Sequence, residues 1–150
     1  MKVLVPVETA SRELNYKIIL ANKLANLGFV VYLGKKKEIN YLVSKFKGYI
    51  YFDKGYHEGV TEPLHKLIKE RGGKIISLDE EGGIDFNDNK IIKNRYSNFL
   101  FENANIIFFW GSDQLDSIKN SRALNVNHYV TGHPRFDLLK REMHFLYEKD

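Results

Sequence analysis

Short, unbroken apolar runs recur along this chain and constrain its fold more than any other feature. The first is Val3-Leu4-Val5-Pro6-Val7, and others lie at residues 29–33 and 49–52. They are continuous rather than alternating in polarity, which is typical of parallel strands that are covered on both faces.

Segments with helical spacing lie between these runs. Leu14, Ile18 and Ala21 predict a helix after the first run, and Thr61 is placed to cap a helix that ends at Gly72-Gly73. The predicted strands cover residues 3–7, 29–33, 49–52, 74–78, 105–110 and 128–131. Repeated strand-helix-strand units require right-handed crossovers. We therefore expect an α/β fold, a Rossmann-like parallel sheet of about six strands with helices on both faces.

The C-terminal region departs from this alternation. After a loop-like stretch at 84–93 and a helix that Ser112 can cap, the sequence predicts a helix over Leu138–Tyr147 with no strand after it. We expect a Rossmann-like domain over residues 1–135 and a connector helix over 136–150, as in one half of a larger protein.

Composition excludes several classes of protein. Hydrophobic residues at 43% and charged residues at 28% are ordinary for a globular domain, and the net charge of +4 is too small to name a partner. The chain has no cysteine, which favours a reducing compartment, so we expect a cytoplasmic location. No run approaches the roughly 20 apolar residues of a membrane span, so any membrane association would be peripheral, at the inner face.

Ligands of an open parallel sheet bind beyond the carboxyl ends of its strands, so polar residues in those loops are the candidates. The strongest is Asp79-Glu80-Glu81, because Gly82-Gly83 permits a sharp turn after it. Glu81 or Glu80 is predicted to act as a general base on a substrate hydroxyl. The alternative is a solvated acidic turn.

Two further loops offer charged side chains. Glu8 and Arg12 follow the first strand, although they also suit a plain helix N-terminus, and His133 and Arg135 flank a rigid proline in a form that suits a phosphate or carboxylate. A connector turn is the alternative for the second pair. The predicted substrate-binding residues are Glu8, Arg12, Asp79, Gly82, Gly83, His133 and Arg135.

Other ligands are not indicated. The first loop lacks both G-x-G-x-x-G and G-x-x-x-x-G-K-[ST], so no nucleotide cradle is expected in this half. His57 and Glu58 are adjacent, with no other ligand at metal-binding spacing, so neither a metal nor a cofactor is expected. The strand aromatics lie in apolar runs, so no nucleic-acid partner is expected.

Several motifs together carry a family resemblance. They are Val5-Pro6-Val7-Glu8, Arg12-Glu13-Leu14, Leu33-Gly34-Lys35, Asp79-Glu80-Glu81-Gly82-Gly83 and Val130-Thr131-Gly132-His133-Pro134-Arg135-Phe136-Asp137. The chain resembles surface carbohydrate biosynthesis proteins, which are similar to GT-B glycosyltransferases of the Kdo-transferase and glycerophosphotransferase type, some linked to nonulosonic sugars.

The resemblance implies the acceptor-binding N-terminal domain of a glycosyltransferase. That enzyme would move an acidic, Kdo-like or sialic-acid-like sugar to a glycan acceptor, a surface polysaccharide precursor. The sugar nucleotide, a CMP-sugar, would be bound mainly by a C-terminal domain that this sequence lacks, so the isolated domain is expected to be inactive.

A non-catalytic α/β domain, receiver-like or binding a small ligand, is the alternative. A receiver-like domain needs a phosphorylatable Asp at the end of the third strand and a Lys at the end of the fifth. Asp53 meets the first requirement, but Trp110-Gly111 does not meet the second.

Overall fold

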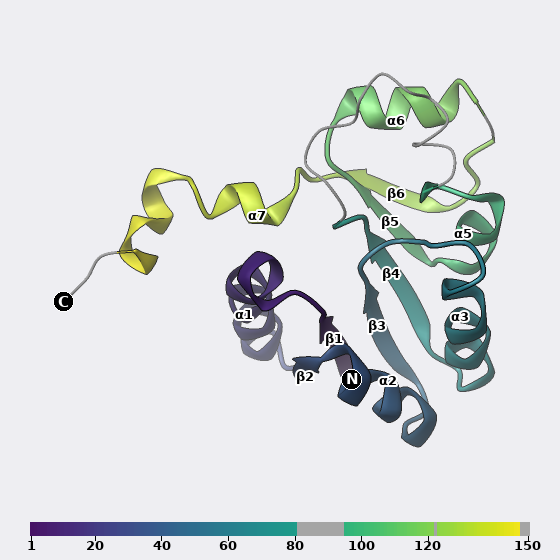
Figure 1. Ribbon diagram of the computed structural model, residues 1–150, viewed down its shortest axis with the longest axis horizontal. Helices are drawn as coiled ribbons and strands as arrows, with labels where there is room; N and C mark the ends of the chain where they lie inside the picture. Colours follow the sequence, from purple (N-terminus) through teal and green to yellow (C-terminus); the bar gives the residue numbers. More distant parts are fainter. Residues whose placement is uncertain (81–94, 122, 148–150) are drawn as a thin grey trace.

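The computed structural model describes residues 1–80, 95–121 and 123–147, which form an α/β fold around one parallel sheet (Figure 1). The strands are β1 (Lys2–Val7), β2 (Val30–Lys35), β3 (Tyr49–Asp53), β4 (Lys74–Leu78), β5 (Ile106–Phe109) and β6 (Asn127–Val130). The helices are α1 (Ala10–Asn26), α2 (Lys36–Lys45), α3 (Thr61–Glu70), α5 (Asn98–Asn103), α6 (Ser112–Lys119), α7 (Pro134–Asp137) and the 3-10 helix η1 (Arg141–Leu146). The predicted six-stranded, Rossmann-like parallel sheet is confirmed.

The strand order across the sheet is β2-β1-β3-β4-β5-β6. Val3 of β1 lies opposite Val31 of β2 on one side and Ile50 of β3 on the other. The chain therefore reverses its direction of travel after β2, and the topological switch lies between β1 and β3. Sheets of this kind bind ligands at the carboxyl ends of the strands beside the switch.

The handedness of the crossovers decides which helix covers which face. The β1-to-β2 connection runs one way across the sheet and every later connection runs the other way, so right-handed crossovers place α1 opposite α2, α3, α5 and α6. Figure 1 shows α1 on one side of the sheet and α2, α3 and α5 on the other. The prediction of helices on both faces is confirmed.

Each face of the sheet has its own apolar core. Under α1, Leu20 and Leu24 pack against a cluster that includes Val3, Val5 and Leu78. The opposite core is larger and joins residues from all four helices on that side to the buried residues of the strands. Its buried members include Ile39, Val43, Tyr51, Ile68, Ile75, Leu100, Ile107, Phe109 and Ile118. These clusters account for the apolar runs in the sequence, because alternate residues of one strand enter different cores.

The predicted helix over Leu138–Tyr147 is wrong. A short α7 ends at Asp137, and the chain then turns before η1, with Met143 N–H donating to the Lys140 carbonyl at 2.9 Å, an i to i+3 bond. Leu138 is buried against α1 while Leu139 is exposed. The conformation of this segment is therefore determined by its contact with α1. The 3.6-residue periodicity of a single helix does not determine it. In Figure 1 the segment passes α1 on its way to the C-terminus.

Two predicted helix caps are each displaced by one residue. Thr61 is the first residue of α3 rather than its cap, although its hydroxyl accepts a hydrogen bond from the His57 N–H at 2.9 Å. Ser112 is likewise the first residue of α6, and Gly111 occupies the cap.

Candidate functional site

Buried polar side chains gather at the carboxyl edge of the sheet. They come from the first turns of α1, from the ends of the strands and the loops after them, and from the first turn of α6. The buried polar and charged residues of this edge are Glu13, Lys17, Asp53, Lys54, Ser77, Asp79, Glu80, Gln114 and His133. Such groups are costly to bury without partners, so their contacts define what the edge can do.

Glu13 holds the loop between β1 and α1. Its two carboxylate oxygens accept hydrogen bonds from the N–H of Glu8 at 2.9 Å and the N–H of Thr9 at 3.2 Å. Burial raises the pKa of Glu13, but the Glu8 backbone hydrogen bond and the Lys17 charge outweigh it and hold the pKa at about 2. Glu13 is therefore a carboxylate at neutral pH, and it caps its own helix.

Lys17 lies one turn further along α1 and is fully buried. Its ammonium donates to the Pro6 carbonyl at 2.7 Å, to Glu13 at 3.1 Å and to Glu80 at 2.8 Å. Burial lowers the pKa of Lys17 to about 8, against the opposing effect of Glu13. Lys17 thus ties α1 to the ends of β1 and β4. The sequence analysis missed it, although the i, i+4 spacing from Glu13 is a signal for the pair.

Glu80 lies just after β4 and is 1% exposed. One carboxylate oxygen accepts from the Tyr16 hydroxyl and the other from Lys17. The predicted general base therefore accepts one hydrogen bond on each oxygen, and its burial means that a substrate hydroxyl could contact it only after neighbouring side chains moved. The other predicted base, Glu81, lies outside the described residues, as do Gly82 and Gly83.

Asp79 binds Arg95 and Trp110 at this edge. The Arg95 guanidinium lies 3.0 Å from the Asp79 carboxylate and 5.4 Å from the centre of the Trp110 ring, and the indole N–H donates to the Asp79 carbonyl at 2.7 Å. A Cβ at Gly55 would lie 3.2 Å from Asp79 at a φ of +132°, so the β3 loop needs glycine to approach so closely.

Glu8 and Arg12 follow β1, one of the two strands that border the switch. Glu8 pairs with Lys54, which lowers the pKa of Glu8, and with Lys36 at 3.4 Å. Arg12 pairs with Glu13 at 3.1 Å. A cavity of about 510 Å³ adjoins Glu8, with Lys35, Lys36, Lys37, Asn40, Val7 and Ala10 around it. Its volume falls in the range of small-ligand sites.

His133 carries a buried polar atom with no hydrogen-bond partner among the residues that the structure describes. The ring is 4% exposed and its Nδ1 accepts from the Arg135 N–H at 3.1 Å, whereas Nε2 is the atom without a partner. Burial lowers the pKa of His133 to about 4, and the charges of Arg135 and Arg12 act in the same direction. The ring is therefore neutral at pH 7 with its proton on Nε2, which is a buried donor lacking an acceptor.

Tyr16 links the two predicted parts of the site. Its hydroxyl donates to Glu80, and its ring meets His133 edge-on at 6.3 Å. Trp110 lies on another side of His133, at 5.4 Å between ring centres. The structure thus joins Glu80 to His133 through one aromatic residue. Arg135 lies over the ring of Phe136 at 5.2 Å.

No protein-family model, curated protein or solved structure matches this chain. The function has to be inferred from the fold and the geometry of the site.

Asp53 is the residue that the receiver-like alternative would phosphorylate. It is buried, its carboxylate accepts from the Ser77 hydroxyl at 3.2 Å, and it lies 3.5 Å from the His65 ring. Within the described parts of the chain, no group of three or more His, Asp or Glu side chains is arranged to hold a metal ion. No described helix is long and apolar enough to cross a membrane.

Proposed function

We propose that this chain is the acceptor-binding, Rossmann-like half of a glycosyltransferase that transfers an acidic sugar to a surface polysaccharide precursor. The observation that carries the proposal is the cavity of about 510 Å³ beside Glu8 at the carboxyl edge. It lies beyond the carboxyl ends of β1 and β2, the edge of the sheet where open parallel sheets bind their ligands, and β1 also borders the switch. Its rim of lysines, with the Asn40 amide and the Glu8 carboxylate, suits a ligand that carries both hydroxyls and negative charge.

His133, outside the lining of that cavity, offers a second place for an anionic group of the ligand. Its Nε2–H is a donor without an acceptor, and the Arg12 and Arg135 charges act on the ring. Leaving a buried donor unpaired costs about 1–3 kcal/mol, which a carboxylate or phosphate oxygen would recover. Phe136, which is 45% exposed, is the ring beside His133 most open to displacement as the ligand enters.

Transfer requires a base for the acceptor hydroxyl. As the hydroxyl oxygen bonds to the anomeric carbon, its proton passes to a carboxylate, and the nucleotide phosphate leaves with the electrons of the broken C–O bond. Glu80 is the predicted carboxylate among the described residues, and this role stays a prediction. The donor, a CMP-sugar, would be bound mainly by a second domain.

A binding-only domain for a small ligand is the alternative. The engagement of both Glu80 oxygens favours it, because a carboxylate held by Tyr16 and Lys17 serves to position α1. In either case the ligand would occupy the same edge.

Binding of acidic sugars tests the proposal. We expect N-acetylneuraminate or Kdo, probes for an acceptor that itself carries a carboxylate, to bind the chain in an NMR titration more tightly than galactose, and CMP to bind weakly or not at all. The double variant Lys36→Gln/Lys37→Gln should lose affinity by about fivefold or more, whereas Lys66→Gln, an exposed lysine on α3, should not.

His133→Phe keeps an aromatic ring but removes the donor, and it should also weaken binding of the acidic sugars. Equal binding of acidic and neutral sugars, or tight binding of CMP, would overturn the proposal. Tight CMP binding would place the nucleotide site in this half instead.

A further inference from the structure

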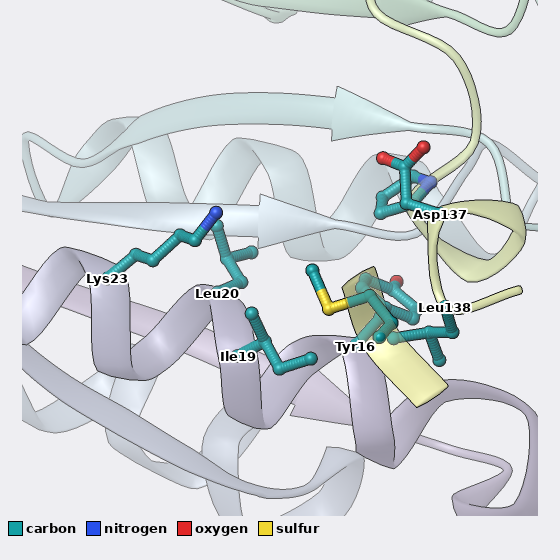
Figure 2. Close-up of a pocket in the computed structure, with 8 residues that line it drawn as sticks. Tyr16, Ile19, Leu20, Lys23, Asp137 and Leu138 are labelled. Carbon is teal, nitrogen blue, oxygen red and sulfur yellow. The ribbon is translucent and has the colours of Figure 1, made fainter. Parts of the chain in front are cut away.

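We infer a second binding site, for an amphiphile with an apolar body and an anionic head, in the pocket between α1 and the C-terminal segment (Figure 2). The inference does not depend on the proposed glycosyl transfer, because this pocket lies along α1 and is separate from the cavity beside Glu8.

The α1 wall of the pocket is a single stripe of the helix. Tyr16, Ile19, Leu20 and Lys23 are spaced i, i+3, i+4 and i+7, so they face the same way. The first three contribute apolar surface to the pocket, and Lys23 places an amine at one end of the stripe, as Figure 2 shows.

The opposite wall comes from α7 and η1. Pro134, Leu138 and Met143 line the pocket from this side. Leu138 is labelled in Figure 2. The cavity is about 160 Å³. An apolar cavity of about 150 Å³ can hold a benzene molecule, so this one fits a ring or a short hydrocarbon chain.

The two charged residues of the pocket differ in their pairing. Asp137 lies 2.7 Å from the Lys140 ammonium, so its charge is matched within the C-terminal segment. Lys23 is exposed and has no ion pair or hydrogen bond with any residue that the structure describes. An unmatched cation at the end of an apolar slot complements a carboxylate attached to a hydrocarbon chain.

Octanoate is the probe for this site, and methionine is the reporter. The chain has two methionines, so labelling their methyl groups with ¹³C gives one signal from the pocket, Met143, and one from the exposed Met1. We expect octanoate to shift the Met143 signal and leave the Met1 signal in place. From butanoate to hexanoate, each added methylene should tighten binding about fourfold.

Variants separate the two parts of the recognition. Lys23→Gln should weaken the binding of octanoate about two- to fivefold and leave the binding of octanol unchanged. Lys119→Gln, at an exposed lysine on α6, should change neither affinity. Ile19→Trp should fill the cavity and abolish the binding of both octanoate and octanol. A melting curve followed by circular dichroism checks that this variant still folds.

Three outcomes would overturn the inference: no shift of Met143 at 10 mM octanoate, equal shifts of Met143 and Met1, or octanoate affinity unaffected by both Lys23→Gln and Ile19→Trp. Because sugar binding at the carboxyl edge is measured separately, failure here leaves the proposed function untouched.

Discussion

Lys17 shows how a single charged residue is accommodated between a helix and a sheet. A buried ammonium is costly, and here two carboxylates and one carbonyl surround it within 3.1 Å. Removing the cation would leave Glu13 and Glu80 facing each other with no positive charge between them.

Replacement of Lys17 is therefore predicted to be severe. Lys17→Met should lower the free energy of unfolding by about 3–5 kcal/mol in urea denaturation, because it removes the buried cation that pairs with both Glu13 and Glu80. Lys36→Met, which breaks a partly exposed pair with Glu8 at 3.4 Å, should cost less than about 1 kcal/mol. Similar losses in the two variants would contradict a structural role for the buried network.

His133 predicts a pH dependence of stability. Its pKa falls from 6.5 to about 4 on folding, so the unfolded chain binds more protons between these values and stability drops as the pH falls from 6.5 to 4. The shift corresponds to about 3 kcal/mol.

Urea denaturation at pH 6.5 and pH 4.5 measures this loss of stability. His133→Phe is the comparison, because that variant should lose less stability between the two pH values. An imidazole NMR titration giving a His133 pKa near 6.5 would refute the prediction.

At the scale of elements, the turn from α3 into β4 depends on close backbone packing. A Cβ at Gly73 would lie 2.7 Å from the Ile68 side chain and 2.9 Å from the Ile68 carbonyl. Neither neighbour can retreat easily, because Ile68 is fully buried and its carbonyl accepts the Gly73 N–H at 2.8 Å.

Gly73→Ala should therefore destabilise the protein by about 1–3 kcal/mol. Gly34→Ala is the matched control, because a Cβ there meets only Ile39 at 3.7 Å, an ordinary contact. Its stability should change by less than about 0.5 kcal/mol. Thermal melts of the two variants measure the difference, and equal melting temperatures would show that the turn relaxes.

At the scale of the whole molecule, the order of the strands sets where the fold is most protected. β1 and β3 lie inside the sheet, and β1 is covered on one face by α1 and on the other by α2, whereas α7 and η1 lie outside the sheet. Cooperative opening should begin in the C-terminal segment.

Amide hydrogen exchange should be slowest in β1 and β3 and fastest in residues 134–147. The difference should exceed a factor of about 100, since core strands exchange through global unfolding and loosely packed segments through local opening. Exchange of α7 as slow as that of β1 would mean that the C-terminal segment is integral to the core.

The sequence by itself determined the strands, the fold class and the edge where the polar residues meet. Apolar runs and helical spacing are local patterns, and right-handed crossovers then leave few topologies. The sequence placed Glu80 and His133 at the ends of their strands. It also predicted a helix at 138–147, and this prediction is wrong.

The tertiary structure alone decided which side chains meet. Lys17 and Glu80 are 63 positions apart and are joined because β1 and β4 flank β3 in the sheet. The unpartnered Nε2 of His133 and the pocket between α1 and α7 depend on how the chain turns back after β6. Such contacts follow from strand order and packing across the fold, which no local pattern of residues records.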